Sequence, residues 1–183
     1  MPTIDATVGG ANSNSYITVD EATTYFGERL RSDAWTAAST ADREKALIMS
    51  CRHIEAARPM IQRGTIGAYA PSNRTQALSF PRKKDWKSGP GYYIPQAVKQ
   101  AQCEEVLALL ARGAETDRRR ALQAAGVTTF SVDGLSESYG SPAAQHPIES
   151  AEARALLASY LRKGGVIATS DQALGEWSPG SEE

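Results

Sequence analysis

Few residues of this chain are of the types that carry out acid–base or nucleophilic chemistry, and they are widely separated. The two histidines, His53 and His146, lie far apart in the sequence, and the two cysteines, Cys51 and Cys103, lack paired spacing. No combination of Asp, Glu, His and Cys follows the intervals of a metal site. The sequence therefore predicts no catalytic, metal-binding or cofactor-binding residues, and we expect a binding protein rather than an enzyme.

The most basic part of the sequence also contains aromatic residues. Between positions 74 and 87 there are five cationic residues and one acid, Asp85, a local charge of +4. The cations expected to contact a partner are Arg82, Lys83, Lys84 and Lys87. Trp86, Tyr92 and Tyr93 flank them, and basic residues beside exposed aromatics are typical of single-stranded DNA surfaces. A solvated loop is the other interpretation of this segment.

The overall composition narrows the class of protein. The 183 residues include 20 Lys and Arg and 21 Asp and Glu, for a formal net charge of −1. This balance argues against a protein that wraps nucleic acid with its whole surface. No apolar run approaches the roughly 20 residues needed to cross a bilayer, and no basic region precedes an apolar segment at the N-terminus. We expect a soluble protein that is not exported, has no membrane partner and keeps its cysteines buried in a reducing compartment.

Helical spacing of apolar residues predicts a small bundle. Thr18 and Glu21 have capping-box spacing, so a first helix begins there. The other helices run from Ser39 or Thr40 to Pro59, from Pro95 to about Arg112, and from about Ser150 to Lys163, with a short helix near 118–122. Apolar residues line two faces of the helix after Pro95, which predicts that it is central. The polar residues in its first half predict that this end emerges toward solvent or a neighbouring subunit; they are Lys99, Gln100, Gln102, Glu104 and Glu105.

A β-hairpin is predicted at about Thr128–Tyr139. Asp133 and Gly134 supply the two positive-φ positions of a tight turn between short β-prone runs. In that register Val132 faces Leu135. A two-stranded ribbon is marginally stable alone, so it packs either on the helices of this chain or on those of a neighbour.

The predicted fold class is therefore mainly α: four to five helices, one β-hairpin, and extended N- and C-terminal segments. The expected organisation is an N-terminal arm over 1–15, a helical domain over 16–163 with an inserted loop at 59–94 and the hairpin at 127–140, and an acidic tail over 164–183. From residue 166 onward the tail has a charge of −4 and no basic residue. Its apolar residues are candidate anchors for a partner: Val166, Ile167, Leu174 and Trp177.

Several short motifs, taken in order, resemble a known family. They are Asn14–Ala22 with Tyr25, Phe26 and Trp35, then Ala46–Ile48, Ala77–Arg82, Ile94–Glu104 and the Ser-rich hairpin. Together they resemble tailed-bacteriophage head–tail connector (neck adaptor) proteins, a group often labelled as DnaT-like single-stranded-DNA-binding domains. The resemblance covers roughly Asn14 to Lys163.

The resemblance implies a structural virion protein at the neck, or head–tail junction, assembled in the bacterial cytoplasm. It would form a dodecameric homo-oligomeric ring below the portal protein, complete the head after DNA packaging and join it to the next neck or tail protein. Packaged double-stranded DNA would pass through the lumen near the basic loop, unless that loop meets an acidic neighbour, and the tail anchors would bind the portal. The alternative hypothesis is a single-stranded-DNA-binding module of a replication or recombination system; an unrecognised enzyme is the third.

Overall fold

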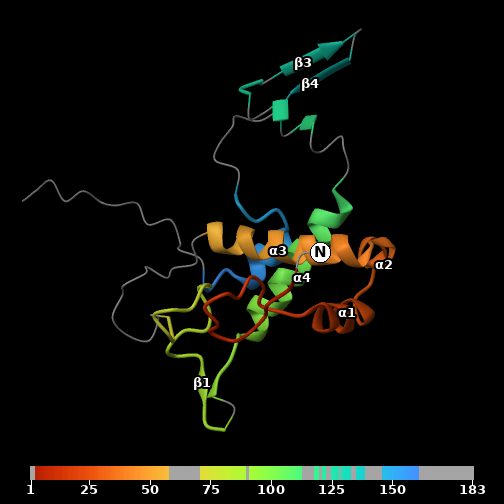
Figure 1. The fold of residues 1–183 in the computed structure, drawn as a ribbon. Helices are drawn as coiled ribbons and strands as arrows, with labels where there is room; N and C mark the ends of the chain where they lie inside the picture. The colour runs from red at the N-terminus through yellow and green to blue at the C-terminus, as the bar shows by residue number, and fades with distance from the viewer. Residues whose placement is uncertain are drawn as a thin grey trace, which may run out of the picture.

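The structure is a computed structural model that describes residues 3–57, 71–89, 91–112, 118–119, 121–122, 125–127, 129–132, 135–138 and 146–160. Five helices are described: α1 (Val19–Gly27), α2 (Asp33–Ala37), α3 (Thr40–Ala56), α4 (Gln96–Ala111) and α6 (Ala151–Leu156). The described strands are β1 (Trp86–Lys87), β2 (Gly91–Tyr92), β3 (Thr129–Val132) and β4 (Leu135–Ser138). Figure 1 shows these elements, and the predicted mainly α fold with a hairpin is confirmed.

The helix starts follow the capping residues seen in the sequence. Thr18 Oγ1 accepts a hydrogen bond from the Glu21 backbone N–H at 3.1 Å, and Glu21 Oε2 accepts one from the Thr18 N–H at 2.9 Å, so the capping box is present. The side chains of Ser39 and Ser150 cap α3 and α6 in the same way. Each such cap is worth about 1 kcal/mol. Pro95, predicted to be the first helical residue, is the N-cap of α4, so the helix begins one residue later, at Gln96.

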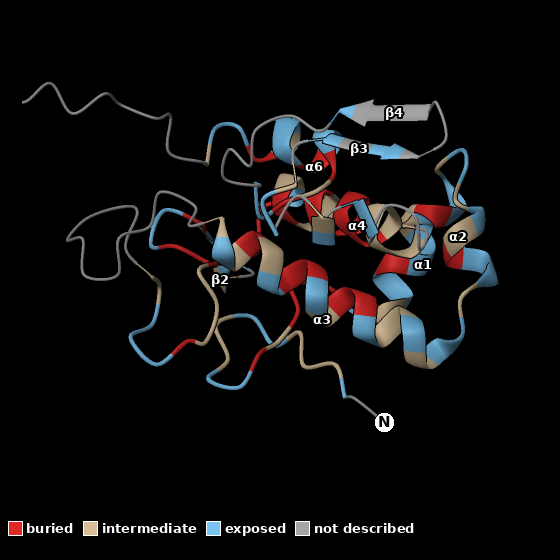
Figure 2. Cartoon of the chain, turned by 90° about the horizontal axis from the view of Figure 1, so that it is seen from above, coloured by how far each residue is buried: buried red, intermediate tan, exposed pale blue. Residues whose placement is uncertain are grey.

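Helix α4 is the central helix, as its apolar faces predicted. It packs against α1, α2, α3 and α6. Val98 and Ala101 belong to one buried apolar cluster, while Cys103 and Val106 belong to a second. Figure 2 colours these buried positions along α3 and α4 red. The helix therefore divides the core, and every neighbouring helix is positioned against it.

Three of these polar residues in α4 do not emerge toward solvent, so that expectation is wrong for them, whereas Lys99 and Gln100 are half-buried. Gln102 and Glu105 are fully buried, and Glu104 is 6% exposed. Gln102 Oε1 accepts a hydrogen bond from the Tyr16 backbone N–H at 3.0 Å, and its Nε2 donates to the Leu47 carbonyl at 2.9 Å. Because these side chains satisfy backbone groups of the same chain, burial costs them few hydrogen bonds. They join segments of one subunit rather than facing a neighbour.

Glu105 links three parts of the bundle. Its carboxylate accepts hydrogen bonds from the backbone N–H groups of Glu149 at 3.0 Å and Ser150 at 2.8 Å, just before α6. It also lies 2.7 Å from His53 Nδ1 on α3. This contact fixes the position of α6 on α3 and α4. No helix in the described ranges combines the length and apolarity needed to span a membrane.

Two antiparallel ribbons are present. In β3–β4, Val132 pairs with Leu135, as predicted; the turn residues between them lie outside the described residues. The second ribbon, β1–β2, was not predicted, and it falls inside the inserted loop 59–94. There Trp86 pairs with Tyr92 and Lys87 with Gly91, whose φ of +77° suits a glycine. The tail anchors Val166, Ile167, Leu174 and Trp177 also lie outside the described residues.

Candidate nucleic-acid interface

The β1–β2 ribbon is held on the helical body by a buried aromatic residue that precedes it. Phe80 is 1% exposed and makes edge-to-face contacts with Tyr16, at 5.8 Å between ring centroids, and with Tyr160, at 5.4 Å. Such pairs contribute about 0.5–1.5 kcal/mol beyond their buried area. Phe80 therefore anchors the segment 71–95 between the start of the chain and the end of α6.

Side-chain hydrogen bonds replace regular secondary structure in this segment. Glu55 on α3 accepts from the Ser79 hydroxyl at 2.7 Å and from the Ser79 backbone N–H at 3.2 Å. Gln76 Nε2 donates to the carbonyls of Leu78 at 2.7 Å and Pro81 at 3.0 Å. Because these bonds come from side chains, the segment is ordered without hydrophobic periodicity. Sequence reasoning saw only a long loop here.

Arg82 and Asp85 form the base of the ribbon. The Asp85 carboxylate accepts from the Arg82 backbone N–H at 2.9 Å, and the Asp85 N–H donates to the Arg82 carbonyl at 2.9 Å. The Tyr93 N–H then donates to the Asp85 carbonyl at 3.0 Å, which aligns the two strands. The Arg82 guanidinium lies 4.3 Å from the Phe80 ring centroid and 5.3 Å from that of Tyr160.

Arg82 consequently differs from its predicted role as a contact residue. The side chain is 1% exposed and lies within the aromatic cluster that supports the ribbon. Asp85, the acid of this segment, is 4% exposed. Arg82 therefore contributes to the scaffold, and the surface charge of the turn comes from its neighbours.

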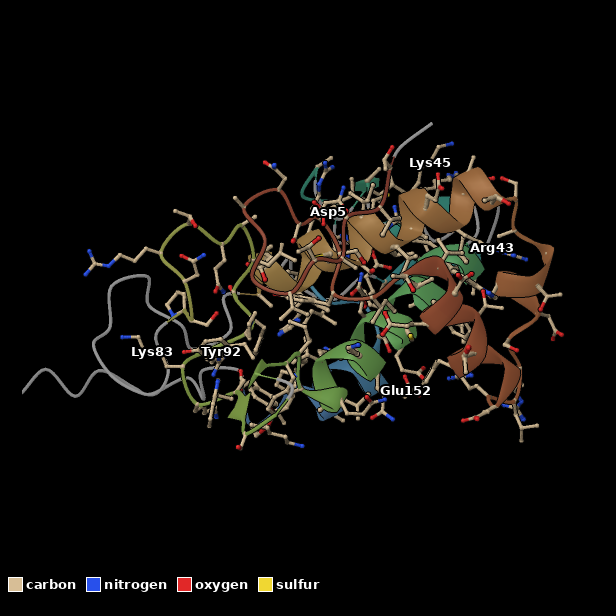
Figure 3. All side chains as sticks on the ribbon, turned by 60° about the horizontal axis from the view of Figure 1, so that its bottom comes forward. Asp5, Arg43, Lys45, Lys83, Tyr92 and Glu152 are labelled. Carbon is tan, nitrogen blue, oxygen red and sulfur yellow. The ribbon has the colours of Figure 1, made fainter. Side chains whose placement is uncertain are left out.

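The three other predicted contact residues, Lys83, Lys84 and Lys87, are all exposed. Figure 3 shows Lys83 and Tyr92 at one end of the molecule, away from Arg43 and Lys45. The Lys84 ammonium lies 5.3 Å from the Tyr160 ring centroid, and the Lys87 ammonium lies 4.7 Å from that of Tyr93. These ring contacts orient two of the ammonium groups.

Trp86 and Tyr92 form an exposed aromatic pair. They lie opposite each other in the β1–β2 register, so their side chains share one face of the ribbon. Trp86 is 55% exposed and Tyr92 is 41% exposed. Lys87 and Tyr93, each next in the chain, occupy the other face. One face of the ribbon thus offers aromatic rings to solvent, while Lys87 lies on the opposite face.

The remaining chemistry of the described residues is structural. Burial raises the pKa of the Cys103 thiol to about 12, with a further contribution from the Glu104 carboxylate, so this thiol is a poor nucleophile near neutral pH. Burial also raises the pKa of Cys51. Across the described ranges, no three His, Cys, Asp or Glu side chains gather where a metal ion could bind. The arrangement is suited to binding bases by stacking and phosphates by charge.

The family comparison agrees with this chemistry. A family model described as "Putative DnaT-like ssDNA binding protein" matches residues 3–172. The chain belongs to this family. Neither the curated proteins nor the solved structures gave a match to the chain.

Membership in the DnaT-like family corrects the function inferred from sequence. The expectation of a bacteriophage head–tail connector is wrong, because the matched family is described by single-stranded DNA binding. The same finding overturns the dodecameric ring, the portal, the next neck or tail protein and packaged double-stranded DNA as partners. Part of α4 was also expected to face solvent or a neighbouring subunit. In the structure, Gln102, Glu104 and Glu105 are buried and form hydrogen bonds within the same chain.

Proposed function

We propose that this protein binds single-stranded DNA through the surface formed by Trp86, Tyr92, Lys83, Lys84 and Lys87, hereafter the aromatic–lysine surface. The observation that carries the proposal is the exposed cross-strand pair of Trp86 and Tyr92 in a ribbon and turn that also expose three lysines. Aromatic rings stack on unpaired bases at about 1–3 kcal/mol per base, and lysines neutralise the adjacent phosphates. No catalytic step is part of this function.

The surface favours single strands over duplexes for a geometric reason. In a duplex the faces of the bases are already stacked on one another, whereas in a single strand they are accessible to Trp86 and Tyr92. The charge is local, since the whole chain has a formal net charge of −1. Binding should therefore depend on stacking as well as on phosphate contacts, and it should tolerate many base sequences.

The proposal is tested by fluorescence anisotropy with labelled oligothymidylate and with a duplex of equal length. We expect the full chain to bind the single strand more tightly than the duplex. The double variant W86A/Y92A should lose affinity for the single strand by at least about thirtyfold, the value expected when two stacking contacts are removed.

The matched control is L30A/M49A, which removes two other exposed apolar side chains, 86% and 43% exposed, from distant parts of the fold. Its affinity should equal that of the wild type. Equal affinity of W86A/Y92A and L30A/M49A would place the binding surface elsewhere. Absence of single-strand binding by the wild type would refute the function itself.

A further inference from the structure

The last described residue of the chain lies at the edge of the aromatic–lysine surface. The Tyr160 ring contacts Phe80 at 5.4 Å between centroids, and the Arg82 guanidinium and Lys84 ammonium each lie 5.3 Å from its centroid. Tyr160 therefore lies beside Lys84. The acidic tail, residues 164–183, begins four residues later in the sequence.

The composition of the acidic tail is complementary to that surface. It contains Asp171, Glu176, Glu182 and Glu183 and no basic residue. The described residues of 71–95 expose four cations and bury their one acid: the exposed cations are Arg74, Lys83, Lys84 and Lys87. The tail also carries Trp177, whose flat aromatic ring can stack on another ring as a nucleobase does. It thus offers both features that the surface would recognise in DNA, negative charge and a flat ring.

Covalent connection limits how far the tail can be from the surface. Asp171 follows Tyr160 by eleven residues. Since each residue spans at most about 3.6 Å, Asp171 lies within about 40 Å of Tyr160 in any conformation. One carboxylate confined to a sphere of that radius has an effective concentration of about a few millimolar. A contact with a dissociation constant in the millimolar range or below would therefore form within a single molecule.

We infer that residues 164–183 bind the aromatic–lysine surface of the same chain and compete with single-stranded DNA for it. This inference rests on the function proposed above, because it concerns regulation of the same surface. Opposite charges that contact each other in the free protein must separate before phosphates replace the carboxylates. The tail therefore lowers the apparent affinity for DNA and favours long strands, which make enough contacts to displace it.

The test measures the binding of labelled oligothymidylate at low salt by the wild-type protein and two variants. D171N/E176Q removes two tail carboxylates, and the matched control E28Q/D33N removes two exposed carboxylates from the helical body. The net charge changes equally in both variants. We expect D171N/E176Q to bind about three- to tenfold more tightly than E28Q/D33N, as two exposed charge contacts allow. The difference should disappear at about 0.5 M salt, where screening is strong.

A second measurement tests the contact without DNA. A synthetic peptide of residues 164–183, labelled with a fluorophore, is titrated with D171N/E176Q and with D171N/E176Q carrying K83Q/K84Q/K87Q. Binding by the first protein, and weaker binding by the second, supports the inference. Equal DNA affinities of D171N/E176Q and E28Q/D33N, together with no peptide binding, would overturn it while leaving the DNA-binding function intact. Peptide binding with no DNA binding by any variant would instead refute the proposed function.

Discussion

Trp86 and Tyr92 stand directly opposite each other across β1 and β2, and both rings are open to solvent. Trp35, in contrast, is 2% exposed and packs on Phe26 with ring centroids 4.8 Å apart. The two described tryptophans therefore report on different environments. A ligand that stacks on the ribbon changes the surroundings of Trp86 and leaves those of Trp35 unaltered.

Intrinsic fluorescence should follow DNA binding through Trp86. We expect oligothymidylate to quench the emission of the wild-type protein, because a base stacked on an indole ring quenches it. W86F should lose most of the quenching while keeping part of the affinity, since phenylalanine still stacks. W35F is the matched control and should retain the quenching. Equal quenching in W86F and the wild type would contradict stacking at this site.

The lysines should determine how binding depends on salt. Replacing Lys83, Lys84 and Lys87 with glutamine removes three expected phosphate contacts. For single strands the logarithm of affinity falls by about 0.7 per contact for each tenfold rise in salt. We therefore expect K83Q/K84Q/K87Q to reduce the salt slope by about 2, measured by anisotropy between 50 and 300 mM NaCl. The control K45Q/R52Q/R154Q, on exposed positions of α3 and α6, should keep the slope.

The helical elements other than α2 were predictable because their determinants are local; α2 was not predicted, and it has no side-chain cap at Ser32. The capping box at Thr18 and Glu21, the cap at Ser39 and the apolar faces of α4 all act within a few residues. The burial of Gln102 and Glu105 was not predictable from spacing. Their partners, such as Leu47 and Ser150, are distant in sequence, and a polar residue in an apolar helix face is ordinarily taken as a solvent-facing position.

The candidate site was predictable in composition but not in structure. The lysines and aromatics near Trp86 could be recognised as a group, but their division between two faces depends on a ribbon with strands of two residues. Arg82 could not be separated from Lys83 by charge alone. Its burial follows from the rings of Phe80 and Tyr160, which lie far apart in the sequence.

Glu104 should make stability depend on acid pH. Its carboxylate accepts hydrogen bonds from Arg29 Nε and Nη2 at 2.6 and 2.7 Å, and from the Tyr25 hydroxyl at 2.6 Å. Burial alone would raise the pKa of Glu104, but these bonds from Arg29 and Tyr25 hold it below the ordinary value of 4.5. The ionised form is therefore favoured in the folded state. Its contribution is complete above pH 4.5 and is lost as the pH falls through the lowered pKa.

We expect E104Q to unfold with a free energy about 2 kcal/mol lower than that of the wild type at pH 7, since it leaves Arg29 without its charged partner. The difference should shrink as the pH falls below 4.5 and through the lowered pKa of Glu104, because the wild-type carboxyl becomes protonated. Urea unfolding followed by circular dichroism measures both values. E28Q, which removes an exposed carboxylate, is the control and should stay within about 0.5 kcal/mol of the wild type. A difference independent of pH would contradict this assignment.

Gln102 should contribute to stability through the backbone groups that it satisfies. The side chain is fully buried, and it bonds the Tyr16 N–H, the Leu47 carbonyl and the Ser15 hydroxyl at 2.8–3.0 Å. Q102L keeps a similar volume but removes the acceptor of the buried Tyr16 N–H, whereas the Leu47 carbonyl still accepts from the Ser50 hydroxyl and the Ser15 hydroxyl still donates to the Ile17 carbonyl. One unsatisfied buried group costs about 1–3 kcal/mol, so we expect a loss of about 2 kcal/mol in urea unfolding. The neighbouring Q100L, at a half-buried position, should change stability by less than about 1 kcal/mol. Equal stability of the two variants would mean that water or a rearranged side chain replaces the amide.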